Sequence, residues 1–537
     1  MRGFQQYDPW TRPLELKWPC SSRQGDLAHT SFRPRVTEVA FTSWSFVIFF
    51  SIVLIGLGIL RRRSEKQCLV LIASIVFYAY WNAAYILLLA TPSLIDYVCS
   101  KRIESAHLPS TRRFWLLVSV LTNLGLLGYF KYANFFVQSI ASAIGTKPMH
   151  LDILLPIGIS FYTFKTLSYT IDVYRGQLPA CRSLWKYAMF VTYFPELIAG
   201  PIVRASVFLP QMTRSLKPSW PRTVIGLQLI LLGFTKKLGI ADRVSPFVDR
   251  VFQSPDRFTP VTVTLAVIAY SLQIYCDFSG YSDMAIGVSK IIGFDLPENF
   301  NMPYLATSIT EFWRRWHMTL SQWLRDYLYI PLGGNRRGRW RTYLNLLITM
   351  LLGGLWHGAN WTFVFWGFLH GLGLAVHKGW MELRPRRGEP SIAGRILGWA
   401  ATYAFVCIAW VFFRSPSFSM AMRVLAKLFW LNTGGVQWIY SPLLMLIPVV
   451  IFGHAMGVLA RRQVGQNARF GVPPQWAEAL YKSAGKQRFS VRPHKAAGVY
   501  FLLPLENRIG EIALTFWIAL ALLLANVKTQ PFIYFQF

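Results

Sequence analysis

The stretch from Glu311 to Gly371 reads EFWRRWHMTLSQWLRDYLYIPLGGNRRGRWRTYLNLLITMLLGGLWHGANWTFVFWGFLHG. It contains two histidines, His317 and His357, which are set among tryptophans and separated by a basic turn that contains glycines. The sequence on both sides is strongly apolar. A histidine at membrane depth is costly to keep, so each of the two is a hypothesis for a functional site.

The composition around this stretch is that of a membrane protein. Of the 537 residues, 53% are hydrophobic and 15% are charged, whereas soluble proteins carry about 25% charged residues. Apolar runs of spanning length recur from Phe41 to the C-terminus. We therefore expect an all-α polytopic protein in a lipid bilayer, with about 11–12 spans plus re-entrant or amphipathic helices.

The charge and the cysteines exclude other classes of protein. The net charge of +31 would suggest nucleic acid in a soluble protein, but basic residues collect in the cytoplasmic loops of membrane proteins. No nucleic-acid partner is therefore expected. The six cysteines form no CxxC pair, which leaves a metal site or a disulfide framework without support.

The domain organisation is simple. Residues 1–38 are polar and mixed in charge, and we expect a disordered leader without chemistry. Residues 39–537 are predicted to form a single membrane domain, whose core motif region is 275–371.

Two apolar segments are predicted to be broken. Cys68–Ser100 has basic clusters at both ends, so we expect two short antiparallel spans with a turn at Trp81-Asn82. Leu184–Pro210 is interrupted by prolines and a glutamate, which favours a re-entrant element. Irregular backbone at membrane depth survives only where protein buries it or a cavity adjoins it.

An acidic segment precedes the first histidine. Asp277–Asn301 mixes three aspartates and one glutamate with glycines. We expect short helices at the cytoplasmic mouth of a cavity, and an ordinary interfacial loop is the alternative.

The first histidine is predicted to lie on an amphipathic helix. With 3.6 residues per turn, His317 shares one face with Trp313, Leu320 and Leu324, which places its side chain inward. The alternative is a core histidine that bonds a backbone carbonyl. The basic loop Arg336–Arg341 that follows is either a cytoplasmic topology anchor or a contact for an anionic donor.

The second histidine falls between two predicted spans, Tyr343–Leu355 and Trp361–His377. Glycines on both sides of His357 allow the backbone or a ligand to approach closely and loosen the helix there. A purely structural role for this histidine is the alternative. His370 and His377 fall near the end of the returning span, and we expect both at the membrane interface.

No signature of a soluble enzyme is present: the chain has no GxSxG elbow, Walker loop or HExxH motif. A neutral imidazole can take a proton from a nucleophile that attacks an activated acyl group, which is worth about 10²–10⁴-fold in rate. A transporter is a rival class, but no internal repeat of interrupted spans is seen. A scaffold that only recruits a periplasmic partner is another.

Long motifs in this chain resemble those of the membrane-bound O-acyltransferase (MBOAT) family, and most closely its bacterial members that acetylate alginate. The first of them covers the two histidines, from Phe312 to Gly371. The others are PIGISFYTFKTLSYTIDVYRG (Pro156–Gly176), FPELIAGPIVR (Phe194–Arg204), YCDFSGYSDMAIG (Tyr275–Gly287) and the C-terminal PFIYFQF.

The resemblance implies a ring of helices around the site, a catalytic His357 and a second functional histidine, His317. If both line one tunnel, His357 would act as a base or as a transient acyl acceptor, and His317 would position the thioester or hold a hydrogen-bonding water. No metal is expected. Further candidates for substrate binding or for lining a tunnel are Trp313, Trp316, Trp356, Asn360, Asp277 and Asp283.

By the same resemblance, the chain is expected to be a histidine-dependent O-acetyltransferase of the bacterial inner membrane. Acetyl groups from a cytoplasmic thioester, acetyl-CoA or an acyl carrier, would cross the membrane to a periplasmic acetyltransferase partner for exopolysaccharide O-acetylation. No tightly bound cofactor is expected. The alternatives are D-alanyl or acetyl transfer to teichoic acid, peptidoglycan or cellulose.

Overall fold

Helices make up the regular structure of the part of the chain that the computed structural model describes: residues 41–213, 216, 219–384, 391–466, 503, 508–524, 530 and 532. One isolated β-bridge joins Phe258 and Val436. The predicted leader, residues 1–38, lies outside the described residues. The α-helices in chain order are α1 (Trp44–Ile59), α2 (Arg63–Trp81), α3 (Tyr85–Ser105), α4 (Pro109–Leu127), α5 (Ala133–Ala143), α6 (Ile159–Tyr174), α7 (Leu184–Thr192), α8 (Phe194–Leu197), α9 (Ala205–Phe208), α10 (Trp220–Phe234), α11 (Asp242–Gln253), α12 (Pro260–Ile292), α13 (Ile309–Trp313), α14 (Met318–Leu324), α15 (Arg339–His357), α16 (Trp361–Leu383), α17 (Ile392–Arg414), α18 (Phe418–Leu428), α19 (Ser441–Gln466) and α21 (Arg508–Leu524).

Short 3₁₀-helical or π-helical turns join several of these helices. The π-helical turns are η1 (Gly128–Tyr132), η3 (Thr235–Ala241) and η6 (Arg325–Tyr329), and the 3₁₀ turns are η2 (Leu209–Thr213), η4 (Pro255–Arg257) and η5 (Pro303–Leu305). Single π turns inside helices are frequent at functional sites.

Five helical segments among the described residues are long and apolar enough to cross a membrane. They are Pro109–Ala143, Trp220–Gln253, Pro260–Ile292, Ile392–Arg414 and Ser441–Leu459. Two shorter apolar helices cover Trp44–Ile59 and Ile512–Ala521. The count of about 11–12 spans stays a prediction.

The distribution of polar groups is inverted relative to a soluble protein. On α1, Ile48, Ile52 and Ile55 are each 62% exposed, whereas the Asp96 carboxylate is fully buried. That carboxylate accepts hydrogen bonds from Ser119 (2.5 Å) and Asn123 (2.8 Å). Apolar side chains that face outward suit lipid, and a buried charge needs such partners. The predicted fold class, an all-α polytopic membrane protein, is confirmed.

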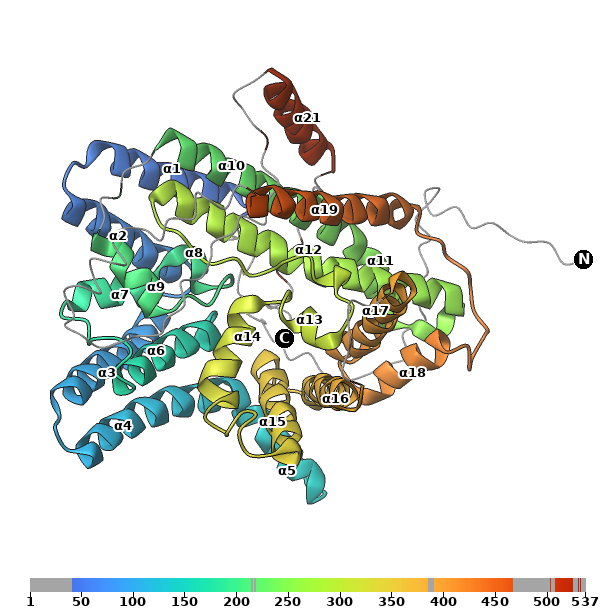
Figure 1. The fold of residues 1–537 in the computed structure, drawn as a ribbon, viewed down its shortest axis with the longest axis horizontal. Helices are drawn as coiled ribbons and strands as arrows, with labels where there is room; N and C mark the ends of the chain where they lie inside the picture. The colour runs from blue at the N-terminus through green and yellow to red at the C-terminus, as the bar shows by residue number, and fades with distance from the viewer. Residues whose placement is uncertain are drawn as a thin grey trace, which may run out of the picture. The chain divides into compact units, whose positions relative to one another are not determined.

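Helix α12 runs between α10 and α17 and is buried along nearly its whole length (Figure 1). Gly280 and Gly287 let it approach its neighbour, because a Cβ there would lie 2.8 Å and 2.5 Å from the carbonyl oxygens of Gly233 and Gly226. The expectation of short helices in Asp277–Asn301 is therefore wrong, since the first sixteen of these residues continue the helix to Ile292.

Both predicted breaks are present. Helices α2 and α3 end and begin around Trp81 and Tyr85, with Asn82 between them. The segment Leu184–Pro210 forms the short helices α7, α8 and α9, whose residues are mostly buried. A buried ion pair explains why a glutamate is tolerated there: Lys165 Nζ lies 2.5 Å from Glu196 Oε1.

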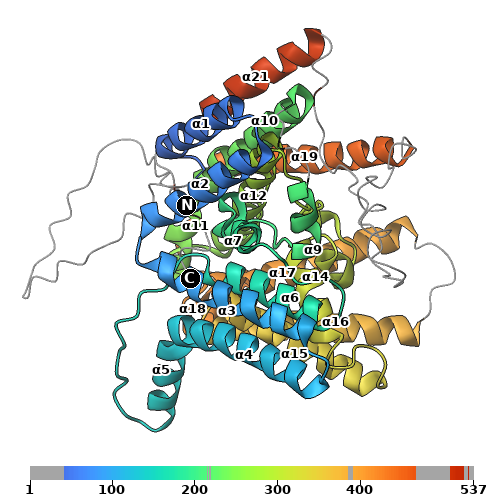
Figure 2. The same ribbon diagram turned by 90° about the vertical axis from the view of Figure 1, so that its left-hand side faces the viewer.

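Helices α15 and α16 form a close hairpin and lie side by side in Figure 1 and Figure 2. A Cβ on Gly354 would lie 2.2 Å from the carbonyl oxygen of Phe363, and one on Gly367 would lie 2.2 Å from that of Met350. His357 is the last residue of α15, directly before the turn between these helices. Gly354 and Gly367 therefore serve helix contact, which fixes where the histidine lies.

Candidate active site

His357 is the last residue of α15, and only 5% of its surface is exposed. Its ring lies between two tryptophans, with centroid distances of 4.9 Å to Trp356 and 5.1 Å to Trp366. Phe413 of α17 closes a third side at 5.3 Å. Three helices therefore hold this imidazole in an apolar, aromatic environment.

A buried lysine holds the end of α15. Lys131 Nζ, on the π-helical turn η1, donates to the carbonyl oxygens of Trp356 and His357, the latter at 3.2 Å. It also lies 3.1 Å from Ser160 Oγ. The last carbonyls of a helix lack partners within the helix, and a cation is favourable there. Lys131 thereby fixes the backbone that carries His357.

His317 does not lie inside a helix, so the predicted amphipathic helix through it is wrong. It stands between α13 and α14 with φ of 39°, the left-handed region that is uncommon for a residue with a side chain. The physical reason is backbone pairing with an extended segment: Met318 N donates to Asn299 O (2.8 Å), and Asn301 N donates to the carbonyl of Arg315 (2.8 Å). The inward, fully buried position of His317 agrees with the prediction.

Asn299 determines which nitrogen of His317 carries the proton. Its Oδ1 lies 2.9 Å from Thr319 Oγ1 and 3.4 Å from the Thr319 backbone N–H, which can only donate. The same oxygen lies 3.0 Å from His317 Nδ1. This imidazole therefore carries its proton on Nδ1 and presents a lone pair on Nε2. That Nε2 has no hydrogen-bond partner among the described residues.

The fold brings the two predicted histidines together across forty residues of sequence. Both rings contact Trp356, His317 at 6.3 Å and His357 at 4.9 Å. Trp356, predicted as a substrate-binding residue, thus lies between them, and its buried Nε1 has no partner in the described part of the chain.

A third histidine belongs to the same cluster. His370 is fully buried in protein, and its predicted position at the membrane interface stays a prediction. Helix α16 packs against α15 and α17. Trp313, another predicted residue, donates from Nε1 to His370 Nδ1 (3.2 Å). The Trp366 ring, which contacts His357, also contacts His370, with 4.7 Å between the ring centroids.

The other predicted residues lie elsewhere. Trp316 is buried against Phe300 and Trp410, at 5.1 Å and 5.0 Å. Asn360 caps α16, because its Oδ1 accepts from the Thr362 backbone N–H (3.0 Å).

The two predicted aspartates, Asp277 and Asp283, pair with lysines of η3. Asp277 lies 2.7 Å from Lys237 Nζ, and Asp283 lies 2.6 Å from Lys236 Nζ. The residue after Asp277 does contact the site: the Phe278 ring packs edge-on against His317, with 4.7 Å between the ring centroids.

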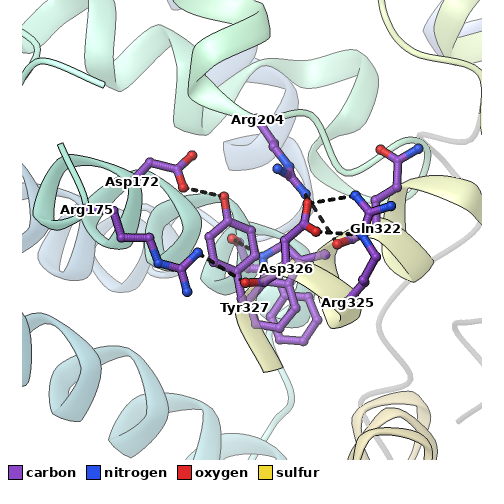
Figure 3. Close-up of polar contacts among 9 residues, drawn as sticks. Asp172, Arg175, Arg204, Gln322, Arg325, Asp326 and Tyr327 are labelled. Carbon is purple, nitrogen blue, oxygen red and sulfur yellow. Dashed lines mark hydrogen bonds and ion pairs between the residues drawn. The ribbon is translucent and has the colours of Figure 1, made fainter. Parts of the chain in front are cut away.

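A column of stacked rings leads away from Trp356. Phe164 stacks on it at 5.1 Å, Trp323 on Phe164 at 3.7 Å, and Tyr327 contacts Trp323 at 5.1 Å. The column ends at a polar cluster (Figure 3), where the Tyr327 hydroxyl donates to Asp172 (2.7 Å).

Asp326 lies at the centre of that polar cluster, between Arg204 and Arg325 (Figure 3). Its carboxylate accepts from Arg204 (2.5 Å) and from Arg325 (2.6 Å). Burial acts to raise the pKa of this carboxyl, but the hydrogen bonds from Arg325 and Arg204 hold the pKa below its ordinary value. The cluster anchors η6, and with it the short helix α14, which begins at Met318 directly after His317.

Sequence reasoning missed Asn299, Lys131 and the contacts of His370 with Trp313 and Trp366. A signal existed for Lys131, because a charge inside a predicted span is itself a functional hypothesis. Asn299 carried none, since its position opposite His317 depends on the tertiary fold. Among the described residues, no group of three His, Cys, Asp or Glu could hold a metal ion. The buried imidazoles can transfer protons and form hydrogen bonds.

Comparison with known proteins gives this site a context. The model of the membrane-bound O-acyltransferase family matches residues 181–422. The chain is 40% identical over 521 residues to "Probable alginate O-acetylase AlgI" of Azotobacter vinelandii, a match covering 93% of this chain and 100% of that protein. It is 45% identical over 403 residues to the protein of the same description from Pseudomonas aeruginosa (74% and 76% covered). A "Peptidoglycan O-acetyltransferase" of Helicobacter pylori is 36% identical over 429 residues (74% and 81% covered).

Proposed function

The chain belongs to the membrane-bound O-acyltransferase family, and we propose that it O-acetylates an alginate-like exopolysaccharide from the bacterial inner membrane. It is an acyltransferase, and the relatives described as alginate O-acetylases support this polymer as the final acceptor. The observation that carries the proposal is the meeting of His317 and His357 on the two sides of Trp356.

Acyl transfer needs a base that stays neutral and a nucleophile that water cannot replace. His357 is enclosed by Trp356, Trp366 and Phe413, which exclude water from its ring. An imidazole in such surroundings can take the proton of the attacking hydroxyl, or accept the acyl group transiently. The Nε2 lone pair of His317 would accept a proton, or a hydrogen bond from a hydroxyl group, near His357.

The donor is a cytoplasmic acyl thioester, acetyl-CoA or an acyl carrier. The ring column from Trp356 through Phe164 and Trp323 to Tyr327 connects the histidines to the arginines of the polar cluster, which would attract the anionic part of this donor. We propose that a periplasmic acetyltransferase takes the acetyl group from the other face of the membrane and delivers it to the polymer.

The decisive genetic test replaces His357 with alanine in the native strain. We expect no ester-linked acetate on the exopolysaccharide, with protein level and membrane insertion unchanged. Wild-type acetylation in a strain that makes the His357→Ala protein at normal level would refute the assignment.

The same strain separates the possible polymers. Deleting the gene should remove acetate from the exopolysaccharide and leave peptidoglycan acetate and D-alanyl esters unchanged. The 36% identity to the peptidoglycan O-acetyltransferase makes a loss of peptidoglycan acetate the principal rival outcome. Loss of D-alanyl esters or of acetate on cellulose would point to those polymers instead.

A further inference from the structure

A hydrogen bond from a tryptophan determines which nitrogen of the buried His370 ring carries the proton. The indole Nε1–H of Trp313 can only donate, and it lies 3.2 Å from His370 Nδ1. The Nδ1 atom is therefore the acceptor, and the neutral ring carries its proton on Nε2. This ring is fully buried, and its Nε2 has no partner within the described part of the structure.

A second unpaired donor lies beside it. Trp366 is 1% exposed, and its indole Nε1 also lacks a partner among the residues that the structure describes. Its ring contacts His370 at 4.7 Å and His357 at 5.1 Å. One of these N–H groups is thus on a ring that contacts His357, the histidine at which acyl transfer is proposed, and the other is on a ring that contacts Trp366. Buried donors are rarely left unpaired, so we expect each of these N–H groups to donate a hydrogen bond to an oxygen atom of a ligand.

We propose that the Nε2–H of His370 and the Nε1–H of Trp366 bind the carbonyl oxygen of the acyl group while it is transferred at His357. The inference rests on the proposed acyltransferase function. It adds a named donor pair for the negative charge that develops on that oxygen, the arrangement that gives the largest electrostatic gain in acyl transfer.

The step balances without further reactants. The oxygen of the acceptor hydroxyl forms a bond to the acyl carbon, and the π pair of the C=O bond moves to its oxygen, between the two N–H groups. When that pair returns, the C–S bond breaks and its electrons leave with sulfur. The hydroxyl proton passes to His357 and then to sulfur, which gives an ester and a thiol.

The test compares two variants of similar size, only one of which has a donor. Glutamine at position 370 can still donate an N–H, whereas methionine cannot. We expect His370→Met to lower kcat by about 100-fold or more and His370→Gln by about tenfold, with the KM for acetyl-CoA within about threefold of wild type in both. The assay uses the purified full chain, labelled acetyl-CoA and the periplasmic fraction.

A purely structural role for His370 predicts the opposite order, because methionine fills an apolar core at least as well as glutamine. Equal kcat values for the two variants would overturn the proposal. His377→Phe, two turns further along α16, is the matched control and should retain wild-type activity.

A second variant covers the case in which His370→Met does not fold. Trp366→Phe removes the N–H and part of the ring but keeps an aromatic side chain, and a loss of about tenfold or more in kcat supports the proposal, whereas wild-type kcat overturns it. Failure of the proposed function is recognised separately, because the wild-type protein itself would then transfer no acetyl group.

Discussion

The two sides of His357 are built alike but carry their protons on opposite nitrogens. On one side, Trp356 leads to His317, whose Nδ1–H donates to Asn299 and whose Nε2 offers a lone pair. On the other side, Trp366 leads to His370, whose Nδ1 accepts from a tryptophan and whose Nε2 offers a proton. One side can accept a proton, and the other can donate a hydrogen bond.

His317 and His370 differ in how much the surrounding protein must stabilise their tautomer and their backbone conformation. A free histidine ring favours the proton on Nε2, so His370 already has the preferred form. His317 is held in the less favoured form and in a left-handed backbone conformation with φ of 39°. Such a conformation costs about 1–3 kcal/mol and persists only where the surroundings determine it. We therefore expect a substitution next to His317, on the side that can accept a proton (the acceptor side), to lower activity more than one next to His370, on the side that donates a hydrogen bond (the donor side).

The largest effect is expected at the centre, which both sides share. His357→Gln should reduce acetyl transfer below detection, because no base remains at the position that both tryptophans contact. His317→Gln should retain partial activity, since loss of a positioning group usually costs less than loss of the base. Acetyl transfer from labelled donor by purified protein measures both. The reverse order of the two variants would exchange the roles.

The next effect concerns the support of the acceptor side. Asn299→Leu removes the oxygen that holds the His317 proton on Nδ1, so the ring should revert to its preferred form. We expect kcat to fall by about 10–100-fold, less than the loss of about 10⁴-fold when a histidine base loses the group that fixes its tautomer, because His317 is a positioning group and His357 is the base. Thr319→Val is the matched control, because it removes a different donor to the same oxygen. Similar losses in the two variants would contradict this account of Asn299.

A smaller effect is expected on the donor side. Trp313→Phe removes the hydrogen bond to His370 Nδ1, but the ring keeps its preferred proton position without help. We expect kcat to fall by about threefold to tenfold. Trp399→Phe, in which the lost indole bond goes to a backbone carbonyl, should leave kcat unchanged. A loss larger than that of Asn299→Leu would reverse the proposed asymmetry.

The smallest effect lies at the far end of the ring column. Because the pKa of the Asp326 carboxyl is lowered in the folded state, its stabilising effect is present above the unfolded pKa of about 4 and is lost as pH falls through the lower folded pKa. Asp326→Asn should therefore lower thermal stability at pH 7 by about 1 kcal/mol or less.

The pH dependence provides the control for this variant. The difference in melting temperature between the wild type and Asp326→Asn should shrink toward pH 3. A constant difference from pH 7 to pH 3 would show that the carboxylate charge is not what stabilises η6.

The buried position of His357 between two helices could be predicted better than the groups that support it. That position and the helix break at Trp81 could be predicted because glycine flanks, apolar runs and basic clusters are local patterns. The catalytic role of His357 stays a prediction. The left-handed position of His317 could not be predicted, since it results from pairing with Asn299 and Asn301, which lie beyond a bend in the chain. Periodicity alone makes the same residues look like one helix.

Long-range contacts account for the other differences. Lys131 reaches the end of α15 across more than two hundred residues of sequence, and Trp313 reaches His370 across 57. Asp277 and Asp283 looked like ligands because carboxylates are rare at membrane depth, but the lysines that pair with them lie on another helical segment. Pairing of this kind depends on which helices become neighbours, which no local pattern encodes.

The opposite proton positions of His317 and His370 can be measured directly by ¹⁵N NMR. The protein would be labelled with ¹⁵N-histidine, and its nine histidines would be reduced to two by difference spectra against His317→Gln and His370→Gln. At pH 7 we predict a protonated Nδ1 and a bare Nε2 for His317, and a bare Nδ1 and a protonated Nε2 for His370. The same tautomer in both rings, or a charged ring at either position, would contradict the account.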